Sequence, residues 1–198
     1  APGQRQFASI DKYIEYYKKK YGYTDEALKL VMDDHLKASE AFSDPNRQAI
    51  SALCAEHDIA LASHDDATLA HVLESESLGG SLAEFPTTVE AGEACHERAL
   101  LVMMGAPNVI RGGSHSGNVA AKDFASRGWL DVLSSDYYPT ALLPAAVKLT
   151  DPEIGMSLGD AIATITENPA KAAYFHDRGH LAEGLRGDVV LFSLDQHG

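Results

Sequence analysis

The stretches VMMGAPNVIRGGSHSGN (102–118) and WLDVLSSDYY (129–138) decide the fold of this chain. Each contains or continues a short apolar run, at 100–105 and 130–135, with the length and composition of a buried strand. The first run opens into a loop rich in glycine, serine and histidine, and the second ends at Asp136. In α/β proteins, the chemistry lies at the carboxyl ends of such strands. Asp136 is therefore the first candidate for a functional residue.

Two earlier apolar runs, at 59–63 and 81–85, have the same character, and helical patterns separate all four runs. Strands and helices that alternate in this way predict parallel βα units with right-handed crossovers. The expected fold class is α/β. His64, the corner at 85–87, the glycine-rich loop and Asp136 each follow one of the runs, so we expect them to meet at the carboxyl edge of one sheet.

Helices are expected on both sides of this region. Before the first strand, the apolar spacing predicts one helix at 8–21, a second capped by Thr24 and a third that begins at Ser43-Asp44-Pro45. Near the end of the chain, residues 158–165 form an apolar-faced helix and residues 188–192 have the pattern of a strand. This late strand would need a partner in another sheet.

Composition narrows the classes of function. The net charge of −13 argues against binding to nucleic acid or to an anionic membrane surface, both of which attract clustered Lys and Arg. No apolar run reaches the roughly 18 residues of a membrane-spanning helix. Cys54 and Cys95 have no metal-type spacing and are interpreted as thiols in a reducing compartment. The expected location is the cytoplasm.

His64 and Asp136 each have two interpretations. A neutral imidazole at a strand end is a good ligand for zinc, iron, nickel or manganese, but His64 could equally help to cap the next helix beside Asp65 and Asp66. Asp136 could bind a metal and take a proton from water, or it could accept hydrogen bonds from nearby amides. Spacing alone does not decide between these roles.

The loop before the last strand carries a more specific signal. Its glycines allow backbone amides to approach an anion, while its polar side chains add donors. It is not a P-loop, because the lysine of that motif is absent. The alternative is a flexible surface turn. The candidate substrate-binding residues are Arg111, Gly112, Gly113, Ser114, His115, Ser116 and Asn118.

Four segments together resemble the amidohydrolase superfamily, and more narrowly its hydrolases of organic phosphonate metabolism: SHDD (63–66), AEFPTT (83–88), MGAPNVIRGGSHSGN (104–118) and LSSDYYP (133–139). The closing residues 167–192 also resemble the usual end of these enzymes. The loop containing GGSHSGN is the most specific part of the resemblance.

The resemblance implies a (β/α)8 TIM-type barrel with an appended small β domain. A whole barrel takes about 250 residues, so the 198 residues are expected to hold its C-terminal part. That part would comprise strands six to eight with their helices at 1–166. Residues 167–198 would form the last helix and the start of the small domain. The chain is expected to begin just after the fifth strand.

The resemblance also implies the site. His64 would be the metal ligand of strand six, and Asp136 would be both the metal ligand of strand eight and the catalytic base. The cofactor would be one or two divalent ions, with zinc expected, and the remaining ligands would be missing from this chain. The loop 111–118 would hold the phosphates of the substrate.

The implied function is that of a metal-dependent diphosphatase, which cleaves a phosphoric anhydride of a phosphorylated sugar phosphonate and releases pyrophosphate. The fragment alone is expected to be inactive, and a homo-oligomer is left open. Two alternatives remain. One is another amidohydrolase, dihydroorotase-like or deaminase-like, that acts on a cyclic amide or an amine. The other is a non-catalytic module that binds anions.

Overall fold

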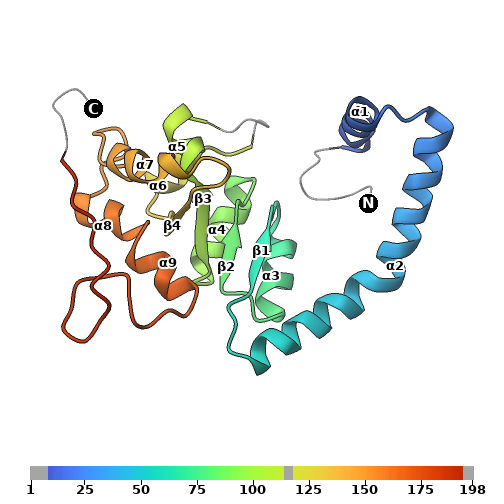
Figure 1. Ribbon diagram of the computed structural model, residues 1–198. Helices are drawn as coiled ribbons and strands as arrows, with labels where there is room; N and C mark the ends of the chain where they lie inside the picture. The colour runs from blue at the N-terminus through green and yellow to red at the C-terminus, as the bar shows by residue number, and fades with distance from the viewer. Residues whose placement is uncertain (1–8, 114–117, 194–198) are drawn as a thin grey trace.

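The computed structural model describes residues 9–113 and 118–193. The elements follow the chain in alternation after two N-terminal helices (Figure 1). They are α1 (Ile10–Tyr21), α2 (Asp25–Glu56), β1 (Ala62–His64), α3 (Leu69–Ser77), β2 (Leu82–Glu84), α4 (Val89–Glu97), β3 (Leu101–Gly105), α5 (Ala106–Arg111), α6 (Ala121–Ala125), β4 (Val132–Ser134), the 3-10 helix η1 (Pro139–Ala141), α7 (Leu142–Lys148), α8 (Leu158–Ala163) and α9 (Glu167–Ala172).

The strands form one parallel sheet in the order β1-β2-β3-β4, so each strand pairs with the next one along the chain. The register aligns His64 with Glu84, and Glu84 with Met103. All carboxyl ends therefore lie at the same edge. The predicted α/β class and the parallel βα units are confirmed.

The assignment of His64 to strand six and Asp136 to strand eight is wrong as a pair. Two strands, β2 and β3, lie between the strand of His64 and the strand before Asp136. Strands six and eight of a barrel have only one strand between them. If β4 is the eighth strand, β1 is the fifth, and the chain holds four consecutive strands rather than three.

Local sequence explains where the helices begin. The hydroxyl of Thr68 accepts a hydrogen bond from the amide of His71 at the start of α3, and Thr88 does the same for Ala91 at the start of α4. Thr24 caps α2 through the amide of Ala27, as its sequence context predicts. These caps fix where each crossover turns back onto the sheet.

The core lies between the sheet and the helices that follow its four strands. Val102 and Met104 of β3 point into it, together with Phe124 of α6, Leu149 and a set of small alanines. Gly92 of α4 faces Phe124 so closely that a Cβ would lie 2.4 Å from Cε1 of the ring. Small residues thus allow α4 and α6 to pack tightly beside the sheet.

The expected break near Ser43 is wrong, because α2 runs without interruption through Pro45. Proline costs a helix one hydrogen bond and a local clash, and its neighbours Ser43, Asp44 and Asn46 are weak helix formers, yet the helix continues. The C-terminal half of α2 is tied to α3: the Ser51 hydroxyl donates to the carbonyl of Leu78 at 2.5 Å, and Arg47 pairs with Glu74 at 3.1 Å.

Among the described helices, none combines the length and the apolar composition that a membrane span requires.

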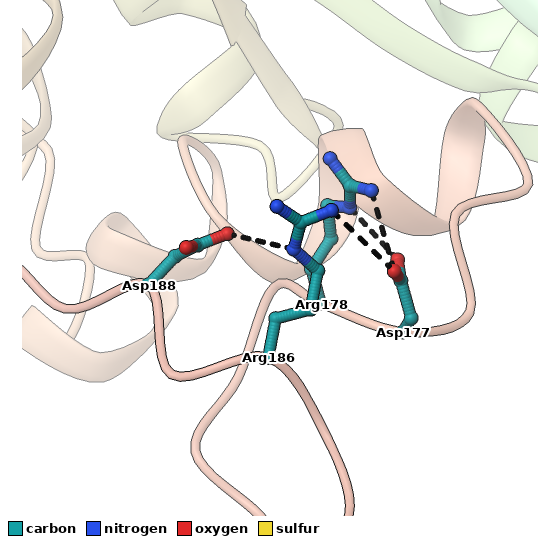
Figure 2. A network of polar contacts seen from close by, with 4 residues as sticks. All are labelled: Asp177, Arg178, Arg186 and Asp188. Carbon is teal, nitrogen blue, oxygen red and sulfur yellow. Dashed lines mark hydrogen bonds and ion pairs between the residues drawn. The ribbon is translucent and has the colours of Figure 1, made fainter.

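The expected strand at 188–192 is also wrong, since these residues belong to no strand. They lie beside no described strand that could supply hydrogen bonds, and Leu191 is 97% exposed. The turn before them is held by charged side chains (Figure 2). Arg178 donates to Asp177 at 2.8 Å and Arg186 donates to Asp188 at 3.1 Å.

The domain boundary predicted at residue 166 stays a prediction.

Candidate active site

A cavity of about 160 Å³ lies at the carboxyl edge of the sheet. Residues that follow or end all four strands line it, together with residues from α5 and from the return of the loop after it. They are Asp65, Phe85, Pro86, Met104, Gly105, Asn108, Arg111, Asn118, Val119 and Asp136. The residues expected to meet at this edge therefore largely do so, although His64 is not among the lining residues.

Three of the lining residues have strained backbones. Asp65, Phe85 and Asp136 have φ angles of 58°, 54° and 51°, in the left-handed region that side chains with a Cβ rarely occupy. Each such residue costs of order 1–3 kcal/mol and persists only where the surroundings enforce it. Strain gathered around one cavity is typical of a functional site.

Asp136 sits in a tight turn after β4. The Tyr138 amide donates to the carbonyl of Ser135 at 3.0 Å, which closes the turn, and the Asp136 amide donates to the Ser134 hydroxyl at 3.1 Å. Gly105 lies against the carboxylate: a Cβ there would be 3.6 Å from Oδ2 of Asp136. The carboxylate therefore packs against the backbone of Gly105 and not against a side chain.

Arg111 is the last residue of α5 and lines the same cavity as Asp136. Its guanidinium donates a hydrogen bond to the hydroxyl of Tyr137. Gly112 ends the helix in the left-handed region with φ 78°, and its amide donates to the carbonyl of Asn108 at 3.0 Å. A cation and a carboxylate therefore share one small cavity. The cation can bind an anionic substrate, and the carboxylate can accept a proton.

The remaining loop candidates are only partly placed. Gly112 and Gly113 follow Arg111 at the start of the loop, and Asn118 lines the cavity where the chain returns. The Val119 amide donates to the carbonyl of Thr87 at 3.1 Å, which anchors the returning end. Ser114, His115 and Ser116 lie outside the described residues.

His64 occupies a neighbouring position. Its Nδ1 is 2.9 Å from Oδ2 of Asp65, its Nε2 is 4.0 Å from Oε2 of Glu84, and its ring meets the ring of Phe85 edge-on at 5.7 Å. The imidazole lines a separate hollow of about 310 Å³ between α2, α3 and β1. His64 and Asp136 are therefore linked through Asp65 and Phe85 but do not share a cavity.

The alternative role of His64 and its acidic neighbours as helix caps is not what the structure shows. Thr68 caps α3 instead. Asp66 is fully buried and accepts a hydrogen bond from the hydroxyl of Ser63, which holds the turn after β1. Asp65 turns its carboxylate to the cavity and to His64.

The side chains near the cavity fit the predicted metal site only in part. Imidazole and carboxylate are the donors that zinc takes in proteins. Within residues 9–113 and 118–193, however, no three His, Cys, Asp or Glu side chains come close enough together to hold an ion. The described residues therefore contain donors of the right chemistry but no complete ligand set.

Seven cavity residues were not proposed as site residues from sequence: Asp65, Phe85, Pro86, Met104, Gly105, Asn108 and Val119. The first two could have been found, because each directly follows a strand whose end was already expected at this edge. Asn108 could not, since its position depends on α5 forming within what the pattern indicated was a loop. The Asn108 side chain accepts a hydrogen bond from the Ala121 amide at 3.0 Å.

Two ionisable groups with raised pKa values, the buried Cys95 and the partly buried Asp131, lie away from the cavity lining. Burial, with the nearby charges of Asp66 and Asp131, raises the pKa of the Cys95 thiol to about 12, so it is no nucleophile at neutral pH. Burial also raises the pKa of Asp131, although the Val102 amide that donates to it at 2.8 Å opposes the shift. Both groups are structural.

A parallel sheet whose strands lead to a polar cavity at their carboxyl ends is the arrangement of barrel hydrolases. Residues 8–196 match the model of the amidohydrolase family, and the chain belongs to that family, whose fold is of the TIM-barrel type and whose members generally use divalent metals. The chain is 53% identical over 192 residues to the α-D-ribose 1-methylphosphonate 5-triphosphate diphosphatase of Escherichia coli (strain K12).

That match covers 96% of this chain and 51% of the relative, so the chain spans about half the length of the curated protein it resembles. No solved structure matches the chain significantly. The family resemblance seen in the sequence is confirmed.

Proposed function

We propose that this chain supplies the C-terminal half of the active site of a metal-dependent diphosphatase. The substrate would be the one that the name of the relative gives, a ribose methylphosphonate that carries a 5-triphosphate. The observation that carries the proposal is the placement of Arg111 and Asp136 in one cavity at the carboxyl edge of the sheet.

The residues of this chain have separate tasks in the proposed reaction. Asp136 takes the proton of the attacking water while a new bond forms between the water oxygen and a phosphorus atom. Arg111 holds the phosphate oxygens, aided by the amides of Gly112 and Gly113 and by Asn118. The phosphoric anhydride bond breaks and pyrophosphate leaves. Ser114, His115 and Ser116 are proposed for the same loop from sequence alone.

His64 and Asp136 would be the metal ligands that this chain contributes, with zinc as the expected metal. When bound, the metal would lower the pKa of a coordinated water and offset charge on the phosphoryl group. The other ligands would come from outside the described residues. Asp65 beside Nδ1 of His64 would orient the ring, as carboxylates commonly do for metal-binding histidines.

The test uses Arg111→Ala in the full-length protein, with pyrophosphate release measured against the concentration of the triphosphate. We expect the KM to rise by about tenfold or more, because a charged hydrogen-bonding partner of the phosphates is lost. Arg98→Ala is the matched control, since Arg98 pairs with Glu76 at 2.8 Å and does not line the cavity. An unchanged KM for Arg111→Ala would remove the proposed role.

Two further measurements separate the alternative functions. Turnover of cyclic amides or amines in place of the triphosphate would favour a dihydroorotase-like or deaminase-like enzyme. Metal analysis of the full-length protein and of His64→Asn addresses the non-catalytic module: a tightly bound divalent ion that the variant loses would contradict it. A cytoplasmic location and a homo-oligomer stay predictions.

A further inference from the structure

We infer that Tyr137 is a positioning residue for substrate anions, which acts by holding the guanidinium of Arg111 in place over the cavity. The inference rests on the proposed function, because it deepens the role given there to Arg111. Tyr137 does not line the cavity itself. It meets the site through the hydrogen bond that its hydroxyl accepts from Arg111.

The backbone around Asp136 explains why Tyr137 can reach Arg111. Asp136 and Tyr137 are the two central residues of the turn that the Tyr138 amide closes onto Ser135 at 3.0 Å. Asp136 has φ 51°, in the left-handed region, and Tyr137 follows it directly in this turn. One turn thus delivers the carboxylate to the cavity and the phenol to the arginine.

The other end of the contact is also fixed. The ammonium of Lys148 in α7 donates to the carbonyl of Ile110 at 3.0 Å, directly before Arg111. The Gly112 amide bonds back to Asn108, directly after it. The backbone on both sides of Arg111 is therefore held, and the hydroxyl of Tyr137 contributes to holding its long side chain.

Arginine has five N–H donors, and the phenol takes one of them through Nη1. A guanidinium can bind the oxygens of a phosphate through several such donors at once. An exposed arginine loses much rotational freedom when it binds a ligand, and a hydroxyl that holds it beforehand reduces that loss. The contribution should appear in substrate affinity rather than in the rate of the bound complex, because Tyr137 does not touch the reacting atoms.

Tyr138 offers a matched control. It is the next residue, it is 57% exposed against 61% for Tyr137, and it does not line the cavity. Four variants of the full-length, metal-loaded protein are needed: Tyr137→Phe, Tyr138→Phe, Arg111→Ala and the double variant Arg111→Ala with Tyr137→Phe. Each removes groups on an exposed surface, so folding is not at risk.

We expect Tyr137→Phe to raise the KM for the triphosphate by about 3- to 10-fold with kcat changed by less than about twofold, as for one lost hydrogen bond to a charged group. Tyr138→Phe should match the wild type. In the Arg111→Ala background, Tyr137→Phe should add nothing. Calorimetric titration with inorganic pyrophosphate should rank the variants in the same order.

Two results would overturn the inference: a KM for Tyr137→Phe equal to that of the wild type, or an equal rise of KM with and without Arg111. If Arg111→Ala raises the KM while Tyr137→Phe does not, the inference fails and the role of Arg111 stands. If Arg111→Ala leaves the KM unchanged, both fail together.

Discussion

Gly92 of α4 lies directly against the ring of Phe124, a residue 32 positions later in the chain, with no room for a methyl group between them. The contact joins the helix after β2 to the helix after the glycine-rich loop. It therefore sets how closely two crossovers of the sheet approach each other.

Gly92→Ala should destabilise the protein by about 1–3 kcal/mol, because the added Cβ would stand 2.4 Å from the Phe124 ring in a filled core. Urea denaturation of both proteins measures the change. Gly159→Ala in α8 is the control, since its Cβ would meet nothing closer than 3.8 Å, and it should be neutral or slightly stabilising. Equal effects of the two substitutions would contradict the packing argument.

Ala99→Gly should stabilise the protein by about 1 kcal/mol, the cost that a left-handed backbone imposes on a residue with a Cβ. Ala99 ends the α4 turn at φ 56° and is exposed, while glycines hold the comparable positions Gly79 and Gly128. The midpoint of thermal unfolding reports the change. Ala38→Gly in the middle of α2 should have the opposite sign, because glycine weakens a helix interior.

Asp131→Asn should stabilise the protein increasingly as the pH rises above the acid range. The raised pKa means that the folded state favours the protonated carboxyl, so the contribution of Asp131 to stability is present below its unfolded pKa and is lost as pH rises through the folded value. Asparagine keeps an acceptor for the Val102 amide and carries no charge. Urea unfolding at several pH values between about 3 and 7 checks the trend; a gain that does not vary with pH would contradict it.

Cys95 should resist thiol reagents in the folded protein, while Cys54 should react. Cys95 is fully buried with a pKa of about 12, whereas Cys54 is partly exposed. Because the pKa of Cys95 is raised in the folded state, the contribution of Cys95 to stability is present below the unfolded pKa of the thiol and declines as the pH rises toward the folded value. Titration with a chromogenic disulfide should modify one thiol natively and two in denaturant. Fast native modification in Cys54→Ser would count against the burial.

The strands and the helix caps could be predicted from sequence, because both depend on neighbouring residues in the chain. Short apolar runs with β-type composition mark the strands, and Thr24 stands where the N-cap of α2 is needed. Pro45 misled the prediction for α2, since a proline signals a break when only neighbouring residues are considered. The helix continues there, and contacts such as that of Ser51 with Leu78 lie 27 residues apart.

The site was predictable in its location but not in its contacts. Asp136 and Arg111 could be placed at one edge of a sheet by counting strand ends. The bond between Arg111 and Tyr137 joins residues 26 positions apart, and no periodicity encodes it. The left-handed conformation at Phe85 could not be predicted from the sequence either, because phenylalanine rarely adopts it, whereas aspartate, as at Asp65, adopts it more often than most residues with a Cβ.

The unbroken helix α2 has a mechanical consequence. α2 follows α1 directly and ends just before β1. It reaches the sheet at the edge where the strands begin, and α1 lies at its far end (Figure 1). Its 32 residues follow a curved path about 48 Å long, so a tilt of about 5° at Glu56 would move Asp25 by up to about 4 Å. Small changes in packing at the foot of the sheet are thereby amplified into displacements of α1 as large as a side chain.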